Sequence, residues 1–465
     1  MRMDKTDLII NRRVALQLMA TAGVSLSSMG CTSAKTLKKA APVSDINSNN
    51  TDIIGATGTR FNLQEAERVM QTLGVDALIL GEGRNFQQAT GCLPVIANMG
   101  WPALNLAILL TKPEPKVITV MLGFSYYYMA SDLKHFSEDD VFLYTFNQIE
   151  DQTEALDSVR FFDRGEAPLS DIEKRRVLST KSILEQKELH HSLGGALQAA
   201  LKSADILNGR LAFDNPYIEL LLTKYADNAT LTSADDALRR IRTIKSPIEI
   251  ELMRASSQIN ISSALAALKQ IGAGASHKDL RRAYYSELSL RDANGVFMVI
   301  DHVSDEQFDA DLVNGQTFLI DCVGEHLGYL GDYGRTVFIG EPEPSAIKAQ
   351  NTVAKAWDSL RNKLKPGITF SDIEKFGQKA MSEQGTTYRV PFKPHSVGVF
   401  HSDHLGNGSS PPREDIVLRP GMIISIDCPV LERGIGGSVH LEDLMLITND
   451  GAEPIHDIGH QAIIL

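Results

Sequence analysis

Two aspartates stand where apolar runs meet a glycine-rich turn. In the stretch FLIDCVGEHLGYLGDYGRTVFIG, the runs 318–320 and 337–339 read as strands, and Asp321 and Asp332 border them. If the two runs pair as a hairpin, both carboxylates can converge on one point. Two carboxylates at one point repel each other and shift each other's pKa unless a cation lies between them. The pair therefore predicts a bound divalent metal ion.

Further acids and histidines follow in later strand-like runs. Asp427 ends the run in GMIISIDCPV, and Glu442 and Asp443 lie inside GGSVHLEDLMLIT. The glycine-containing segment PHSVGVFHSDHLGNG adds three histidines: His395, His401 and His404. Separate strand-like runs that each carry an acid at a core-facing position are typical of a functional site, because buried acids need partners. Carboxylates with an imidazole suit manganese, cobalt, zinc or iron(II).

Helix signals and periodicity predict the elements that position these residues. Ser246 as N-cap, Pro247 in the first turn and Glu249 nearby predict a helix that runs to about residue 270. A second helix is predicted from His277 to about residue 290, and it leads into strands rich in valine, isoleucine and phenylalanine.

Upstream of these helices, helix and strand patterns alternate. Strands are predicted at 77–80, 104–110 and 116–122, and helices around 185–204 and 217–226. This alternation predicts an α/β domain that ends near residue 235.

Length and charge limit the class of protein. The chain has 465 residues, enough for two domains, and its 43% hydrophobic content is that of a globular protein. Its net charge of −12 argues against nucleic-acid binding, which needs a basic face to neutralise phosphates.

The N-terminal segment reads as an export signal. Arg12 and Arg13 precede an apolar stretch from Val14 to about residue 26, which is too short to span a bilayer. The paired arginines resemble a twin-arginine signal, so residues 1–31 are predicted to direct export. The letters SSMGC resemble the box before a lipidated cysteine, so Cys31 is a candidate lipidation site; ordinary cleavage nearby or an uncleaved anchor are the alternatives. Residues 32–55 read as a polar tether, and the expected location is the periplasm, free or as a membrane-anchored lipoprotein.

The remaining cysteines, Cys92, Cys322 and Cys428, are too few for a disulfide framework. Cys322 and Cys428 each follow a candidate acid, and neighbouring strand residues face opposite sides. We therefore expect buried thiols behind the site, with a Cys322–Cys428 bridge as the alternative.

The order Asp, Asp, His, acid, Glu along the chain resembles the M24 metallopeptidase family, the pita-bread fold of methionine aminopeptidases, Xaa-Pro aminopeptidases and prolidases. LIDCVGEHLGYLGDYGRT resembles its strand–turn–strand, and IKSPIEIELMR resembles the helix that opens its catalytic domain. GVDALILGEGRNFQQATG resembles the N-terminal creatinase/prolidase-type domain. The resemblance implies an α/β fold, with a creatinase/prolidase-like domain at residues 56–238 and a pita-bread catalytic domain at residues 239–465.

The resemblance also implies a site for two divalent ions. Its ligands would be two aspartates, a histidine and two further acids: Asp321, Asp332, His395, Asp427 and Glu442. Manganese is the first choice of ion, with cobalt, zinc or iron as alternatives. In such a site the two ions lower the pKa of a bridging water and polarise the substrate carbonyl.

Other residues take supporting roles by the same resemblance. His302, in FMVIDHVSDE, lies near the position of the substrate-side histidine. A second catalytic histidine would be His401 or His404, which stand six and nine residues after His395. Arg335, in DYGRT, would hydrogen-bond to the ligand carboxylates.

Two positions depart from the family pattern. Asp427 stands where the family usually has a glutamate followed by proline, and aspartate is one methylene shorter. His440 stands in VHLED where the proline-directed peptidases usually have VRIED, so a permanently charged arginine is replaced.

The first hypothesis for function is an exported metal-dependent hydrolase, an Xaa-Pro aminopeptidase or dipeptidase, active as a homodimer on peptides. The second keeps the fold and metals but acts on a small molecule, like creatinase or the lyase that cleaves a sulfonium propionate. The third is a non-catalytic binding protein on the same scaffold. Membrane attachment would come from a lipidated Cys31.

Overall fold

A computed structural model gives the structure of the chain. It describes residues 58–81, 83–92, 103–129, 137–146, 159, 168–186, 189–404 and 415–465. The predicted export signal, the tether and Cys31 lie outside the described residues. In the part that is described, no helix is both long and apolar enough to cross a membrane.

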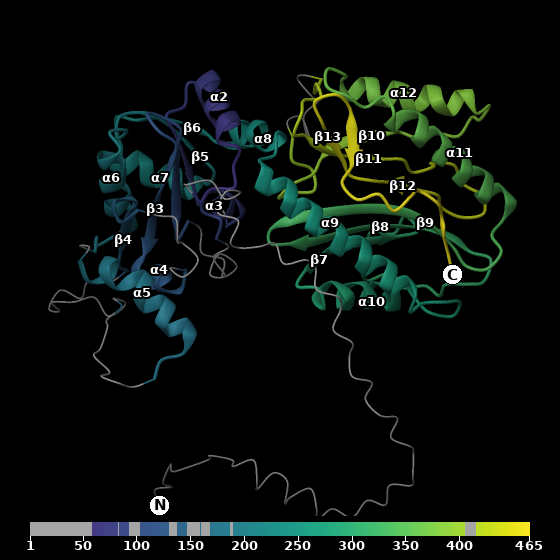
Figure 1. The fold of residues 1–465 in the computed structure, drawn as a ribbon, viewed down its shortest axis with the longest axis horizontal. Helices are drawn as coiled ribbons and strands as arrows, with labels where there is room; N and C mark the ends of the chain where they lie inside the picture. Colours follow the sequence, from purple (N-terminus) through teal and green to yellow (C-terminus); the bar gives the residue numbers. More distant parts are fainter. Residues whose placement is uncertain are drawn as a thin grey trace, which may run out of the picture. The chain divides into compact units, whose positions relative to one another are not determined.

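The N-terminal part contains a mixed sheet of six strands in the order β4-β3-β2-β1-β5-β6 (Figure 1). Strand β2 pairs antiparallel with β1 and β3, and the other neighbours are parallel. The strands are β1 (Ala77–Leu80), β2 (Leu106–Leu110), β3 (Lys116–Leu122), β4 (Val141–Tyr144), β5 (Arg210–Phe213) and β6 (Thr230–Ser233).

Helices cover both faces of this sheet, which explains the unbroken apolar runs of its central strands. Leu78 and Leu80 face one apolar core, and Ala77 and Ile79 face another. The helices are α2 (Leu63–Leu73), α3 (Gly83–Thr90), α4 (Gly123–Met129), α5 (Asp171–Gln186), α6 (Leu193–Ser203), α7 (Pro216–Tyr225) and α8 (Asp235–Thr243), with a 3₁₀ turn at Glu138–Asp140.

The C-terminal part contains two further sheets. One has the order β12-β9-β8-β7 with β15 beside β9, and the other has the order β10-β11-β13-β14. The strands are β7 (Asn294–Ile300), β8 (Thr317–His326), β9 (Tyr329–Phe338), β10 (Lys393–Ser396), β11 (Ile423–Asp427), β12 (Leu441–Glu442), β13 (Met445–Ile447), β14 (Ala452–Pro454) and β15 (Ile463–Ile464).

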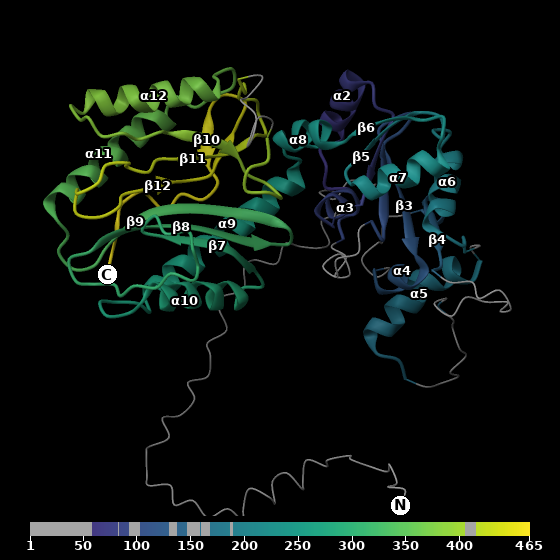
Figure 2. The same ribbon diagram turned by 180° about the vertical axis from the view of Figure 1, so that it is seen from behind.

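Two pairs of helices cover these sheets from opposite sides (Figures 1 and 2). Helices α9 (Pro247–Leu268) and α10 (His277–Ser289) pack on the β7–β9 side, and α11 (Pro344–Arg361) and α12 (Phe370–Glu383) on the side of β10 and β11. The predicted start of α9 is confirmed, because the Ser246 hydroxyl accepts from the Glu249 amide and the Glu249 carboxylate accepts from the Ser246 amide.

The predicted hairpin is confirmed as the antiparallel pair β8 and β9. Its register places Asp321 opposite Gly334 and Val323 opposite Asp332, so the two aspartates share one face as diagonal neighbours. Cys322 points the other way, into the core beneath α9 and α10. All three described cysteines are buried, and no disulfide joins Cys322 to Cys428, so the expectation of buried thiols is confirmed and the alternative bridge is wrong.

The predicted helix at 185–204 is only partly correct. Helix α6 begins at Leu193, where Ser192 caps it, and His190 instead bridges to Tyr144 at the end of β4. The predicted boundary between residues 238 and 239 falls inside α8, and the division into domains at that point stays a prediction.

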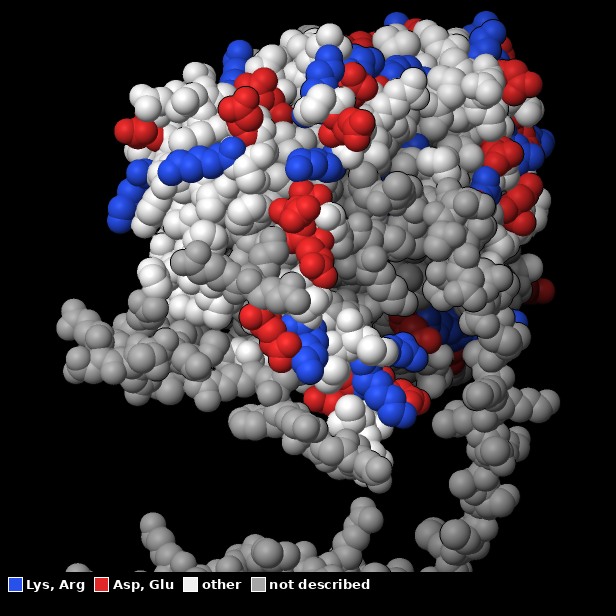
Figure 3. Space-filling model, turned by 60° about the vertical axis from the view of Figure 1, so that its left-hand side comes forward, with Lys and Arg blue, Asp and Glu red and all other residues white. Residues whose placement is uncertain are grey.

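Residues from the N-terminal sheet region contact the tip of the β8–β9 hairpin. Arg60 and Gln87 both donate hydrogen bonds to the Leu327 carbonyl, at 2.9 and 3.0 Å. Arg84 forms an ion pair with Glu325. On the face drawn in Figure 3, the described acidic and basic side chains lie side by side rather than in separate regions.

Candidate metal centre

The shared face of the β8–β9 hairpin holds two carboxylates with buried oxygens that lack hydrogen-bond partners. Asp332 is 1% exposed, and neither of its oxygens has a hydrogen-bond partner. Oδ1 of Asp321 is buried and unpartnered as well. An unpaired charged group in a protein interior lowers the stability of the folded state, so these oxygens need a cation as a partner.

Three further strands bring ligand atoms to these carboxylates. Nε2 of His395, on β10, lies 3.7 Å from Asp332, 3.4 Å from Asp427 and 3.4 Å from Glu442. Asp427 ends β11, and Glu442 lies on β12 and is fully buried. Nδ1 of His395 is 3.0 Å from the carbonyl of His401. Because a carbonyl only accepts, Nδ1 donates its proton to it, and Nε2 is the ring atom that faces the acids. Burial lowers the pKa of His395, but hydrogen bonds to Asp427 and Glu442 raise it well above its usual range, so a metal ion bound at Nε2 would displace a proton.

The ligand atoms form two groups, in each of which all lie within 4.8 Å of one another. The first is Asp332, His395 and His401, and the second is Asp321, Asp427, His440 and Glu442. The donor set of carboxylates and imidazoles, with several buried atoms unsatisfied, fits divalent transition ions. All five predicted ligands are therefore brought together, and their role as ligands stays a prediction.

Burial and like charge perturb the carboxyl groups. Burial, with the charge of Glu442, raises the pKa of Asp332 to about 6, from an ordinary value of 3.8. The same two causes raise the pKa of Asp321 well above its usual range. Burial alone would also raise the pKa of Glu442, but hydrogen bonds from His395 and His440 hold it well below its usual range. The centre cannot hold all its negative charges without added positive charge.

The two alternative histidines of the loop after β10 differ in position. Nε2 of His401 lies 3.4 Å from Asp332, and its ring is tilted beside that of His395. His404 belongs to neither ligand group. Its Nδ1 instead accepts a hydrogen bond from the Ser396 amide at 3.2 Å. Burial lowers the pKa of His404 to about 4. The geometry therefore brings His401, and not His404, to the metal centre.

His302 sits in a tight turn after β7. Asp301 and His302 both have positive φ, at 53° and 62°, and the Val303 amide donates to the Ile300 carbonyl. Such left-handed angles are unfavourable for residues with a Cβ and often mark functional sites. Burial, together with the charges of Arg433 and His440, lowers the pKa of His302. His302 is not a member of either ligand group.

Arg335 is buried and holds the backbone around Glu442. It donates to the Glu442 carbonyl at 2.8 Å, to Asp443 Oδ1 at 2.6 Å and to the Gly459 carbonyl at 2.7 Å. Arg335 thus pairs with the carboxylate of Asp443, and not with a carboxylate of the five predicted ligands. Nε2 of His440 contacts the Glu442 carboxylate at 3.2 Å.

Ser425 is a site residue that the sequence reasoning missed. Its hydroxyl donates to Glu442 Oε1 at 2.7 Å, which orients that carboxylate. Ser425 lies on β11 two residues before Asp427, and strand residues two apart share a face. That period of two was the signal that could have found it.

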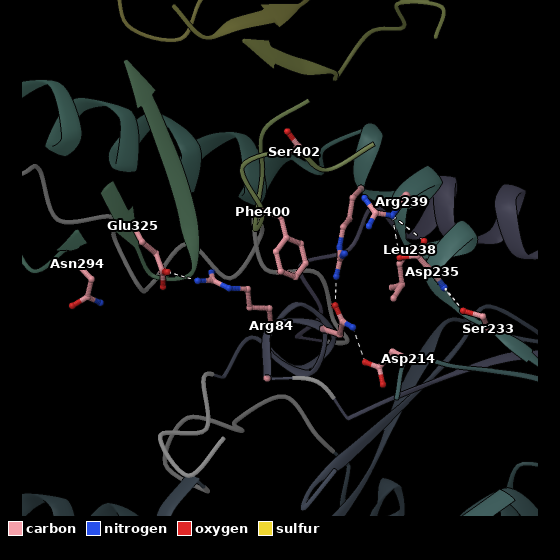
Figure 4. A pocket seen from close by; sticks show the side chains of 13 residues that line it. Arg84, Asp214, Ser233, Asp235, Leu238, Arg239, Asn294, Glu325, Phe400 and Ser402 are labelled. Atoms are coloured by element: carbon pink, nitrogen blue, oxygen red, sulfur yellow. Dashed lines mark hydrogen bonds and ion pairs between the residues drawn. The ribbon is translucent and has the colours of Figure 1, made fainter. Parts of the chain in front are cut away.

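A pocket of about 710 Å³ lies beside the loop that carries His401 (Figure 4). The side chains of Phe400 and Ser402, on either side of His401, line it. Figure 4 shows the Arg84–Glu325 ion pair on one side of Phe400, and Arg239 with Asp235 on the other. Arginines and acids both line it, so the pocket offers charges of both signs: Arg84, Arg239, Arg242, Asp214, Asp235 and Glu325.

The fold and the ligand groups define a pita-bread protein with a candidate two-metal centre. Solved structures share this fold. The prolidase from Pyrococcus horikoshii matches 86% of this chain and 99% of its own, with a TM-score of 0.59 and 18% identity. The X-Pro aminopeptidase from Thermotoga maritima matches 86% of this chain and 100% of its own, with a TM-score of 0.62 and 14% identity.

Sequence comparison points to one family over part of the chain. Residues 251–449 match the model of metallopeptidase family M24. The probable dipeptidase PepE of Mycobacterium tuberculosis is 26% identical over 251 residues, which cover 50% of this chain and 63% of that protein. The Xaa-Pro dipeptidase of Pyrococcus horikoshii is 25% identical over 253 residues, which cover 50% of this chain and 68% of that protein. The chain thus spans less than two thirds of the mycobacterial relative's length.

Proposed function

We propose that the protein is an exported metal-dependent hydrolase that cleaves peptides next to proline, as an Xaa-Pro aminopeptidase or dipeptidase. The observation that carries the proposal is the cluster of buried carboxylate oxygens without hydrogen-bond partners on Asp321 and Asp332, with Nε2 of His395 3.7 Å from Asp332. The names of the relatives, an Xaa-Pro dipeptidase and an X-Pro aminopeptidase, direct the proposal to bonds next to proline.

Two divalent ions would be held by the five predicted ligands, with manganese as the first choice. When bound, they would supply Lewis acidity, which lowers the pKa of water and polarises a peptide carbonyl. The Asp332 carboxylate is buried and neither of its oxygens has a hydrogen-bond partner, so bound ions would offset the cost of its charge. Ser425 and Arg335 would fix the orientation of Glu442 through its side chain and its backbone.

The histidines would act on the substrate. His401 is the more exposed member of the first ligand group, with 36% of its side chain accessible. From there its imidazole would position the substrate carbonyl and stabilise the negative charge that develops on the carbonyl oxygen. His302 would serve the same purpose from the turn after β7.

The pocket beside His401 would receive the part of the peptide that lies away from the centre. Its volume of about 710 Å³ falls within the range of ligand sites, and its mixed charges suit a zwitterionic peptide. Phe400 offers an apolar surface at the same point, since it is 41% exposed.

The test is turnover of a small substrate panel by metal-replete protein. The panel contains Xaa-Pro dipeptides, Xaa-Pro-Xaa tripeptides, peptides without proline, and creatine, each with manganese, cobalt or zinc. We expect cleavage of the proline peptides, and loss of that cleavage in Asp332→Asn but not in Asp311→Asn, a variant of an exposed aspartate. Cleavage of creatine alone would replace the proposal by the small-molecule function.

We also propose that residues 1–31 direct export, that Cys31 becomes a lipid anchor, and that the protein acts as a homodimer. Support for the first two comes from the sequence pattern of that segment. Cell fractionation of Cys31→Ser should move the protein from the membrane to the soluble periplasmic fraction. Light scattering on the purified full-length chain should give twice its mass of 51.0 kDa.

A further inference from the structure

The imidazole of His440 lies among the acids of the second ligand group. Its Nε2 is 3.2 Å from Glu442 Oε2 and 3.9 Å from Asp427 Oδ1, and the residue is 3% exposed. Two ligands bound at about 2.0–2.2 Å to one ion lie at most roughly 4.4 Å apart. Both distances therefore allow His440 to share an ion with these carboxylates.

The sheet is shaped to admit this ring. Gly334 pairs with Asp321 on one side and with Glu442 on the other, so it lies between two predicted ligands. A Cβ on Gly334 would stand 2.4 Å from both Nε2 and Cδ2 of His440. The ring thus occupies the space that a side chain at position 334 would fill.

The backbone of His440 is held in place. Its amide donates to the Thr336 hydroxyl at 3.0 Å, and the following residue, Leu441, pairs with Arg335 on β9. Because residue 440 is anchored to the same strand that carries Gly334, its imidazole is directed into the centre.

We propose that Nε2 of His440 is a direct ligand of the second ion, together with Asp321, Asp427 and Glu442. The inference rests on the proposed two-ion centre and adds an imidazole to a group that otherwise offers only carboxylates. Imidazole suits zinc and iron, whereas carboxylates suit magnesium and manganese. The second position therefore favours zinc or iron over manganese, which remains the first choice for the first position.

The first experiment is ¹¹³Cd nuclear magnetic resonance of wild-type protein that contains ¹⁵N-labelled histidine. The inference predicts two cadmium resonances, each split by coupling to a histidine nitrogen. Two resonances of which one lacks nitrogen coupling would overturn the inference and leave the two-ion centre intact. Binding of fewer than two cadmium ions would overturn the proposed function as well, so the two failures are distinguishable.

The second experiment measures zinc and manganese affinities of variants by calorimetry. His440→Gln keeps a hydrogen-bond donor near Glu442 but removes the imidazole. We expect the affinity of one zinc site to fall by more than about 100-fold. Loss of a residue that only hydrogen-bonds to a ligand lowers metal affinity by roughly 10–100-fold. His404→Gln is the matched control, because His404 belongs to neither group, and it should keep both zinc sites. A loss below 100-fold in His440→Gln would mean that His440 only orients Glu442.

Discussion

Asp332→Asn should change stability in opposite directions with and without metal. In the metal-free protein, burial raises the pKa of Asp332 to about 6, from 3.8. A shift of about 2 units corresponds to about 3 kcal/mol, at about 1.4 kcal/mol per unit. The folded state holds this proton more tightly than the unfolded state, so the destabilisation is absent below pH 3.8 and complete above pH 6.

The asparagine variant lacks this titration. In metal-free protein, its unfolding free energy relative to wild type should therefore rise by about 3 kcal/mol between pH 4 and pH 7. In metal-replete protein the order reverses, because wild type gains about 4.1 kcal/mol when free ion is about 1,000 times its dissociation constant, which exceeds the variant's lead of about 3 kcal/mol. The variant loses a ligand and most of that gain.

Urea unfolding followed by circular dichroism, with and without chelator, measures both effects. Asp311→Asn changes an exposed aspartate and should track wild type in every condition. The reasoning would be refuted if Asp332→Asn and wild type responded equally to pH without metal, or if metal stabilised both proteins equally.

Three further predictions concern neighbours of the centre. Burial lowers the pKa of His404 to about 4, so the unfolding free energy of wild type should fall as the pH drops from 6.5 to 4. In acid unfolding experiments, His404→Gln should lack this part of the fall. Arg335→Met should destabilise by about 3–5 kcal/mol in urea, since it leaves Asp443 buried without its cation, and a smaller loss would show that water replaces the guanidinium. Ser425→Ala should weaken metal binding about 10–100-fold in calorimetry through the freed Glu442, whereas unchanged affinity would remove Ser425 from the centre.

Local rules were sufficient for part of the site. Two apolar runs and the glycine-rich turn between them predicted the hairpin of Asp321 and Asp332, and the capping box predicted the start of α9. Strand β1 was predicted with its bounds because a short apolar run between polar residues can only be buried on both faces. Strands β5 and β6 were not predicted, because neither is an unbroken apolar run: β5 begins with exposed Arg210, and β6 has no fully buried residue.

Tertiary contacts decided the rest of the site. The choice between His401 and His404 depends on how the loop after β10 folds, which hydrogen bonds to Ser396 and His395 determine. No spacing rule contains that information. The position of the His440 ring likewise depends on the missing side chain at Gly334. In the sequence, β10 and β11 separate the two residues, but β9 and β12 pair directly in the sheet.

The proposed function requires two metal ions in this centre for peptide hydrolysis. The most direct test adds manganese, cobalt or zinc stepwise to metal-free protein and follows the hydrolysis of an Xaa-Pro peptide. We expect no turnover without metal, a rate that rises to its maximum at two equivalents per chain, and no rise for Asp332→Asn. Turnover in the metal-free protein, or silence with two ions demonstrably bound, would contradict it.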